Sequence, residues 1–266
     1  MMQERPAEPV SQDADTNHVL AQCRQLLAGD LRFLASLHER EFEPSEIEEL
    51  SAYPIADRFN IQFETSRIEQ CLKLFDEGMV RVNEAGAEPA ADELAADYAD
   101  IYLTHKCRAA PSESVWLDED GLERQQPMFE VRKWYEDFGV SAPNWRVRPD
   151  DHIALQLEFA AHLLGQEQSG AEPVRQAARF LDEHLLVWVD LFASRVAERC
   201  APPLYAGVAT LTAAYLDAAR NFMAQLADFS RPPPDERRKA GGPIALEVTA
   251  AADESPAYVP GVAPGW

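Results

Sequence analysis

RPDDHIALQLEFAAHLL, residues 148–164, is the stretch on which the predicted fold depends. Pro149 disfavours helix for the residue before it, and Asp150 or Asp151 can cap the amides of a first turn, so a helix is predicted to begin here. Two faces of this helix are apolar, one formed by Ile153, Leu157, Ala160 and Leu164, the other by Leu155, Phe159 and Leu163. A helix that is apolar around most of its circumference is expected at the centre of the molecule.

An acidic residue and an imidazole, Asp151 and His152, stand side by side where this helix begins. Such a pair at a loop-to-helix junction is either a structural cap or a recognition point. The pattern alone favours the cap, and the recognition role stays open as its alternative.

Charge and cysteine usage limit the classes of partner. The 266 residues include 46 acidic and 24 basic side chains, which gives a net charge of −22. This charge repels nucleic acid and anionic membrane surfaces and attracts basic partners, so we expect no nucleic-acid partner. Four widely spaced cysteines without a C-x-x-C pair indicate neither a zinc site nor a disulfide framework. With no export signal at residues 1–17 and no run of 18 apolar residues, we expect a cytoplasmic protein without stable membrane insertion.

Helical periodicity accounts for most of the chain. Apolar residues at steps of three and four predict helices at about 17–38, 45–53, 65–84, 89–105, 128–138, 150–164, from about 173, and 203–229. No set of strands and no repeat of 20–50 residues is visible. The prediction is an all-α fold, a single compact helical domain of about eight to ten helices, in which a hinge near 140–150 could join two helical halves.

Three segments are expected along the chain. Residues 1–16 are polar and contain prolines, which predicts a disordered lead, and residues 17–230 form the helical domain. Residues 231–266 are rich in proline, glycine and alanine and are predicted to be a flexible tail. Residues 106–127 lack periodicity and are predicted to be an extended loop. The region 84–123, which overlaps that loop, has a net charge of −9; it is either a solvated face or a docking surface for a positively charged segment.

Enzyme signatures are absent: there is no G-x-G-x-x-G, no P-loop, no H-E-x-x-H and no G-x-S-x-G. The best enzymatic candidates are Asp151, His152, Glu158 and His162, because carboxylates and imidazoles bind metals and transfer protons. Only Glu158 and His162, four residues apart, share a helix face. We therefore expect no catalytic residues, no metal site and no cofactor.

Four blocks of sequence, in order and at matching spacing, carry a family resemblance. They are Tyr98-x-x-Ile101-Tyr102, Pro111-x-x-Ser114-Val115-Trp116-Leu117-Asp118, Pro149-x-Asp151-His152, and Phe180-Leu181-x-x-His184-Leu185-x-x-Trp188 followed by Pro203-Leu204-Tyr205. Over about 90–229 the chain resembles the TorD/DmsD family of redox-enzyme maturation chaperones, which are cytoplasmic and all-helical. One departure is Arg148, which stands where the family's hinge motif has a glutamate.

The resemblance implies a chaperone that binds the twin-arginine leader, the apo form, or both, of a molybdopterin oxidoreductase catalytic subunit. It would assist cofactor insertion and hold the client back from export, as a monomer or a domain-swapped homodimer. The implied leader- and client-binding residues are Tyr98, Ile101, Tyr102, Pro111, Ser114, Trp116, Asp151 and His152. Tyr98, Ile101 and Tyr102 are equally well interpreted as ordinary core.

Three alternatives remain open beside the leader-binding interpretation. One is an assembly chaperone for a molybdoenzyme subunit that has no export leader. Another is a helical metal- or acid/base-dependent enzyme that uses Asp151, His152, Glu158 and His162. The last is a scaffold whose acidic face docks another basic protein.

Overall fold

Helices make up nearly all of the described chain. The computed structural model describes residues 12–104, 106–144, 146–200 and 203–233. Its α-helices are α1 (Gln12–Glu39), α2 (Pro44–Ala52), α3 (Ser66–Ala85), α4 (Ala87–Tyr98), α5 (Glu113–Leu117), α6 (Gln126–Asp137), α7 (Ile153–Leu164), α8 (Glu172–Phe180), α9 (Leu186–Arg199) and α10 (Pro203–Ala227). Over these residues no strand forms, only one isolated β-bridge. The all-α prediction is confirmed.

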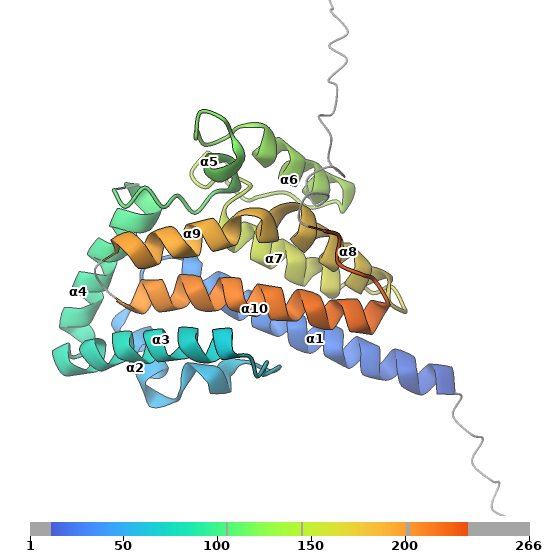
Figure 1. Cartoon of the computed structure of the whole chain (residues 1–266), viewed down its shortest axis with the longest axis horizontal. Coiled ribbons are helices and arrows are strands. Elements are labelled where there is room, and N and C mark those ends of the chain that lie inside the picture. Colours follow the sequence, from blue (N-terminus) through green and yellow to red (C-terminus); the bar gives the residue numbers. More distant parts are fainter. Residues whose placement is uncertain (1–11, 105, 145, 201–202, 234–266) are drawn as a thin grey trace, which may run out of the picture.

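The central position predicted for the helix after Asp151 is confirmed. In α7 the side chains of Ile153, Leu157, Ala160 and Leu164 are fully buried, and Glu158 is the helix's one exposed residue. The helix packs along α1 on one side and against α8 on the other, as Figure 1 shows. Such burial on both sides follows from the two apolar faces of its sequence.

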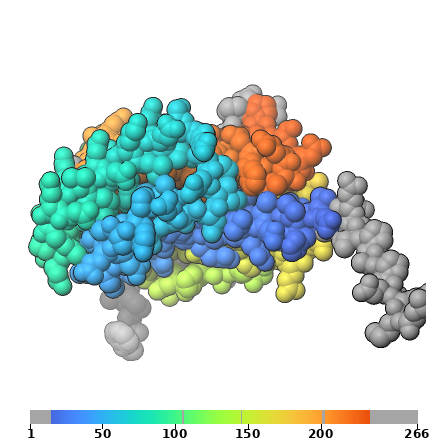
Figure 2. Space-filling view, turned by 90° about the horizontal axis from the view of Figure 1, so that it is seen from below, coloured from blue at the N-terminus to red at the C-terminus, as the bar shows by residue number. Residues whose placement is uncertain are grey.

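A second contact, between α3 and α10, brings two helix backbones together. A Cβ atom added to Gly78 would lie 2.6 Å from the Leu204 Cα, and one added to Gly207 would lie 2.6 Å from the Phe75 Cα. Only glycine allows so close an approach. The two glycines therefore fix where α3 crosses α10. Figure 2 shows α3 and α2 beside α1 on the lower face of the molecule.

The segment between α4 and α7 lies over α7 and α9. Here α5 packs against α6 and α9, and Figure 1 shows α5 and α6 stacked on one side of the bundle. Residues 106–127 were predicted to be an extended loop, but α5 interrupts it with five helical residues. No helix in the described ranges is long and apolar enough to span a membrane.

Several helix ends differ from prediction. The first helix begins at Gln12, so residues 12–16 are helical and not part of a disordered lead. The second helix begins at Pro44, one residue before the predicted start, and its capping box is formed by Glu43 and Glu46. Residues 1–11, and the tail from residue 234, lie outside the described residues.

Short π-helical segments were not foreseen. The helix predicted over 89–105 is α4 followed by a π-helical turn, Ala99–Leu103, and the helix from 173 is divided by another, Leu181–Leu185. A π turn shifts the residues that follow it around the helix axis. Tyr102 lies within the first π turn and His184 within the second.

Candidate functional site

The predicted site residues lie mostly inside the protein. Seven of them are buried, namely Tyr98, Ile101, Tyr102, Pro111, Ser114, Asp151 and His152. Trp116 is half-buried. The structure thus brings the blocks around 111, 151 and 184 together, but it presents only Trp116 of this set to a ligand at the surface.

A short antiparallel bridge joins the chain before α5 to the start of α7. It pairs Ser112 with His152, flanked by a hydrogen bond from Glu113 N to Asp151 O of 3.1 Å and one from Ile153 N to Pro111 O of 2.8 Å. We call residues 109–118 the strap. The bridge holds the strap against α7.

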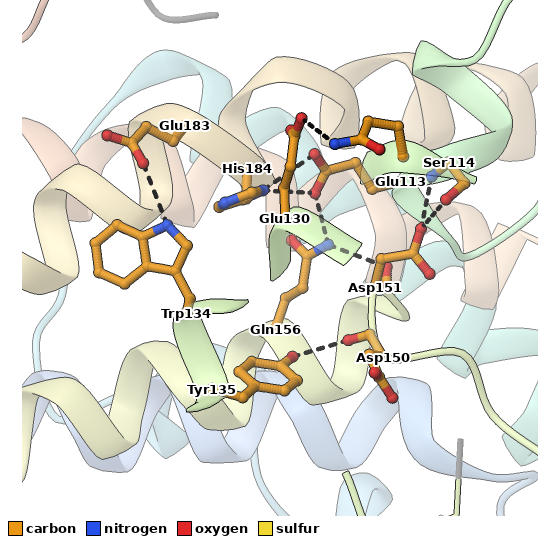
Figure 3. A network of polar contacts seen from close by, with 11 residues as sticks. Glu113, Ser114, Glu130, Trp134, Tyr135, Asp150, Asp151, Gln156, Glu183 and His184 are labelled. Atoms are coloured by element: carbon orange, nitrogen blue, oxygen red, sulfur yellow. Dashed lines mark hydrogen bonds and ion pairs between the residues drawn. The ribbon is translucent and has the colours of Figure 1, made fainter. Parts of the chain in front are cut away.

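A buried carboxylate reinforces this attachment. Asp151 Oδ2 accepts hydrogen bonds from the backbone N of Ser114 at 2.7 Å and from its Oγ at 2.5 Å (Figure 3). The sequence allowed Asp151 as the cap of α7, but its carboxylate does not cap that helix. It binds the first turn of α5 instead, across the contact between the strap and α7. Burial raises the pKa of the Asp151 carboxyl to about 6, because it outweighs the hydrogen bonds from Ser114.

Glu113 links the strap to two further helices. Its carboxylate accepts a hydrogen bond from Gln156 Nε2 at 2.8 Å and lies 3.1 Å from His184 Nδ1 (Figure 3). Burial opposes protonation of His184, but the charge of Glu113 and its hydrogen bond outweigh this and raise the pKa of the imidazole. His184 is thus a hydrogen-bonded histidine of the core. The pair connects α5 with the π turn before α9.

His152 is the actual cap of α7. Its Nδ1 accepts a hydrogen bond from Ala154 N at 3.2 Å. Burial, together with the charges of Arg148 and His38, lowers the pKa of His152 well below its usual value, so the ring is neutral and can accept this bond. Capping by Asp150 or Asp151 was the wrong expectation. Asp150 instead accepts from Arg132 Nε at 2.5 Å.

The aromatic block on α4 faces the core. Tyr98 and Tyr102 stack with ring centroids 4.4 Å apart, and His38 Nδ1 lies 2.6 Å from the Tyr102 hydroxyl. The Tyr98 hydroxyl donates to Glu39 O, the last residue of α1, at 2.8 Å. These side chains fix the end of α4 against α1, as the core interpretation predicts.

Arg148 also binds the end of α1. Its guanidinium donates to Glu39 O and lies 3.6 Å from the Glu39 carboxylate. A cation at the C-terminus of a helix meets the negative end of the helix dipole. The arginine that departs from the family pattern therefore has a defined partner here and ties the predicted hinge segment to α1.

Trp116 is held at the edge of a surface hollow of about 630 Å³. Its Nε1 donates to Ala110 O at 2.9 Å, and the Arg195 guanidinium lies 5.5 Å from the centre of its ring. The hollow is lined by Arg108, Ala110, Val115, Trp116, Gly121, Leu122, Glu123 and Arg195. It offers apolar surface beside two cationic side chains.

The four residues of the enzymatic alternative are engaged separately. Asp151 binds Ser114, and His152 caps α7. Glu158 lies 3.9 Å from Arg32, and His162 Nε2 is hydrogen-bonded to Gln166 at 2.8 Å. Within the described ranges no three His, Cys, Asp or Glu side chains are grouped to hold a metal ion.

Sequence reasoning missed Glu113, Gln156 and Arg195. Glu113 was counted only as part of an acidic run, although it is 1% exposed. Gln156 gave a usable signal, because it is a polar residue within the apolar faces of α7. Arg195 gave none, since its role depends on the contact of α9 with the strap.

Comparison with known proteins gives a consistent result. The family model described as nitrate reductase delta subunit matches residues 64–194. A chaperone protein TorD of Aliivibrio fischeri is 28% identical over 199 residues, which cover 72% of this chain and 92% of the relative. One of Vibrio vulnificus is 28% identical over 62% of this chain and 80% of its own length, and one of Vibrio cholerae is 32% identical over 50% and 64%.

Proposed function

Because the chain belongs to the TorD/DmsD family of redox-enzyme maturation chaperones, we propose that it is a molybdoenzyme maturation chaperone. In this proposal it binds the twin-arginine leader, the apo form, or both, of a molybdopterin oxidoreductase in the cytoplasm. It assists cofactor insertion and delays export until the client is mature. No catalytic step by the chain itself is involved.

The observation that carries the proposal is the attachment of the strap. Three sequence blocks that lie far apart in the chain meet at Asp151, Ser114 and the Glu113–His184 pair, and together they hold Trp116 at the edge of the hollow. A half-exposed tryptophan in a preformed apolar hollow is typical of a peptide-binding site. It suits the apolar segment of a leader.

Buried site residues take a positioning role in this proposal. Asp151 and His152 do not face solvent, so they support binding by fixing the strap and the start of α7. Direct contact of these residues with a leader remains a prediction from the sequence. The net charge of −22 supports the choice of a basic peptide, since it accelerates encounter in a salt-dependent way.

The test is complex formation with a candidate client, namely the apo catalytic subunit of a molybdopterin oxidoreductase from the same cell. Size-exclusion chromatography with light scattering would compare the full subunit with a version that lacks its N-terminal leader. A complex with the full subunit that is lost or strongly weakened without the leader supports the proposal.

Equal binding of both forms would instead favour the second candidate, a chaperone for the mature part of a client without an export leader. The burial of the predicted leader-binding residues favours that candidate, because only Trp116 of the set is accessible. No binding to any molybdoenzyme subunit would overturn the proposal.

A further inference from the structure

A groove separate from the Trp116 hollow lies between α3, α4 and the first turn of α10. Figure 1 shows α4 standing across the end of the bundle at which α10 begins. The groove has a volume of about 390 Å³. Its walls are formed by Gly78, Arg81, Val82 and Ala85 of α3, by Ala90, Glu93, Leu94, Ala96 and Asp97 of α4, and by Pro203 and Leu204.

The floor of the groove is apolar and has few large side chains. Val82, Leu94 and Leu204 are buried there. The close contact of Gly78 with Leu204 leaves this end of α3 without a side chain that would fill the groove. Such a surface suits the aliphatic stem of a long cationic side chain, which packs on apolar atoms while its charged end reaches a carboxylate.

The wall formed by α4 carries more acidic than basic charge. Glu93 and Asp97 are four residues apart and share a helix face, and Asp100 follows one turn later. Lys106 Nζ is 2.5 Å from Asp100 Oδ2, and its charge offsets part of the acidic charge of this face. Within the described residues, no hydrogen bond or ion pair engages the carboxylate of Glu93 or Asp97.

The surroundings of Asp97 shift the pKa of its carboxyl group. Burial raises the pKa of its carboxyl to about 6, and the charges of Asp100 and Glu93 act in the same direction. A half-buried carboxylate with acidic neighbours is stabilised by a cationic ligand. The one basic group on the opposite wall is Arg81, which is exposed and has no ion pair in the described structure.

We infer that the groove between α3, α4 and α10 binds the pair of adjacent arginines of a client leader, through the carboxylates of Glu93 and Asp97. The inference rests on the proposed function. Guanidinium groups are the matching ligand because they bind carboxylates through two parallel hydrogen bonds, which an ammonium group does not provide.

The Trp116 hollow is unsuited to that part of a leader. Arg108 and Arg195 line it with one carboxylate, Glu123, so its lining has a net positive charge that would repel further arginines. The two sites are close in sequence on one side, because Asp97 is the last α4 residue that lines the groove and Arg108 is the first residue that lines the hollow. Burial and the neighbouring Cys107 raise the pKa of the Cys200 thiol, and the charge of Asp97 acts in the same direction. A leader can therefore place its arginines in the groove and its apolar segment in the hollow.

The test is titration calorimetry of the full chain and two double variants with a synthetic leader peptide. The groove variant is Glu93→Gln with Asp97→Asn. The control is Glu136→Gln with Glu167→Gln, which changes the net charge equally at two exposed positions on α6 and after α7. Each protein is titrated with the Arg-Arg peptide and with its Lys-Lys counterpart.

We expect the unaltered chain and the control to prefer Arg-Arg over Lys-Lys, and the groove variant to lose about tenfold or more in Arg-Arg affinity and most of that preference. Arg81→Gln should bind the Arg-Arg peptide more tightly, because it removes the opposing charge. Circular dichroism confirms that each variant is folded.

Failure of leader binding and failure of the groove assignment give different results in these titrations. If the unaltered chain binds neither peptide, the leader-binding part of the proposed function fails and the groove assignment fails with it. If the groove variant keeps its Arg-Arg preference, or if the control loses as much affinity, the assignment to this groove is overturned while leader binding stands. A changed oligomeric mass of the groove variant with intact peptide preference would make a second copy of the chain the occupant, and would overturn the assignment as well.

Discussion

Asp151→Asn replaces the buried carboxylate that holds the strap by a neutral group of the same shape. The asparagine oxygen can still accept the hydrogen bonds from Ser114, at 2.7 and 2.5 Å in the native protein. The substitution therefore removes the titration of Asp151 with little change in geometry. What changes is the dependence of the free energy of unfolding on pH.

The direction follows from the raised pKa of Asp151. Its carboxyl titrates near pH 6 in the folded protein and near 3.9 in the unfolded chain, so the folded state binds the proton more tightly. The resulting stabilisation is fully present below pH 3.9 and is lost as pH rises through about 6. The folded and unfolded pKa of Asp151 differ by about two, which corresponds to about 3 kcal/mol in all, of which roughly 1.5 kcal/mol is still present at pH 5.0.

Urea unfolding followed by circular dichroism at pH 5.0 and 7.5 measures this difference. The free energy of unfolding of the native protein minus that of Asp151→Asn should be about 1.5 kcal/mol larger at pH 5.0 than at pH 7.5. Contributions from His184, Asp97 and other groups cancel in the subtraction. Asp120→Asn, at an exposed position, should show no such difference. A difference of zero, or of opposite sign, for Asp151 would refute the account of its burial.

Three further outcomes are expected. Gly207→Ala should destabilise the protein by about 1–3 kcal/mol or more, measured by urea unfolding, because its Cβ would meet the Phe75 backbone at 2.6 Å. Arg220→Ala should cost about 3–5 kcal/mol in the same assay, since it removes the buried guanidinium 2.7 Å from Asp182; a loss below about 1 kcal/mol would contradict that burial. Trp116→Ala should weaken leader binding in calorimetry about tenfold or more with unchanged helix content, whereas unchanged affinity would remove the hollow from the binding site.

The helices could be predicted because each has an apolar face of its own. The burial of α7 on both sides, for example, follows directly from the positions of Leu157 and Phe159 among their apolar neighbours. The strap could not be predicted in this way. Its helix α5 has five residues, too few for a periodic pattern, and the bonds that hold it join Ser114 to Asp151 and Glu113 to His184, 37 and 71 positions apart.

Some members of the candidate site were predicted, but the burial of Ser114, Asp151 and His152 was not. Sequence blocks identified Ser114, Asp151 and His152, yet the same residue types serve equally well as surface ligands or as internal ties. The choice depends on tertiary contacts: Asp151 is buried where the first turn of α5 meets the start of α7. The groove between α3, α4 and α10 was not predicted. In the sequence, Glu93 and Asp97 are typical of a solvated helix face, and the groove forms only because α3 and α10 pack beside α4.

The most direct test of the central claim is titration calorimetry of the purified full chain with the synthetic twin-arginine leader of a candidate client, at low and high salt. The account predicts micromolar or tighter binding that weakens with salt and on exchange of both arginines for lysine. The absence of binding, or equal binding of the Arg-Arg and Lys-Lys peptides, would contradict it.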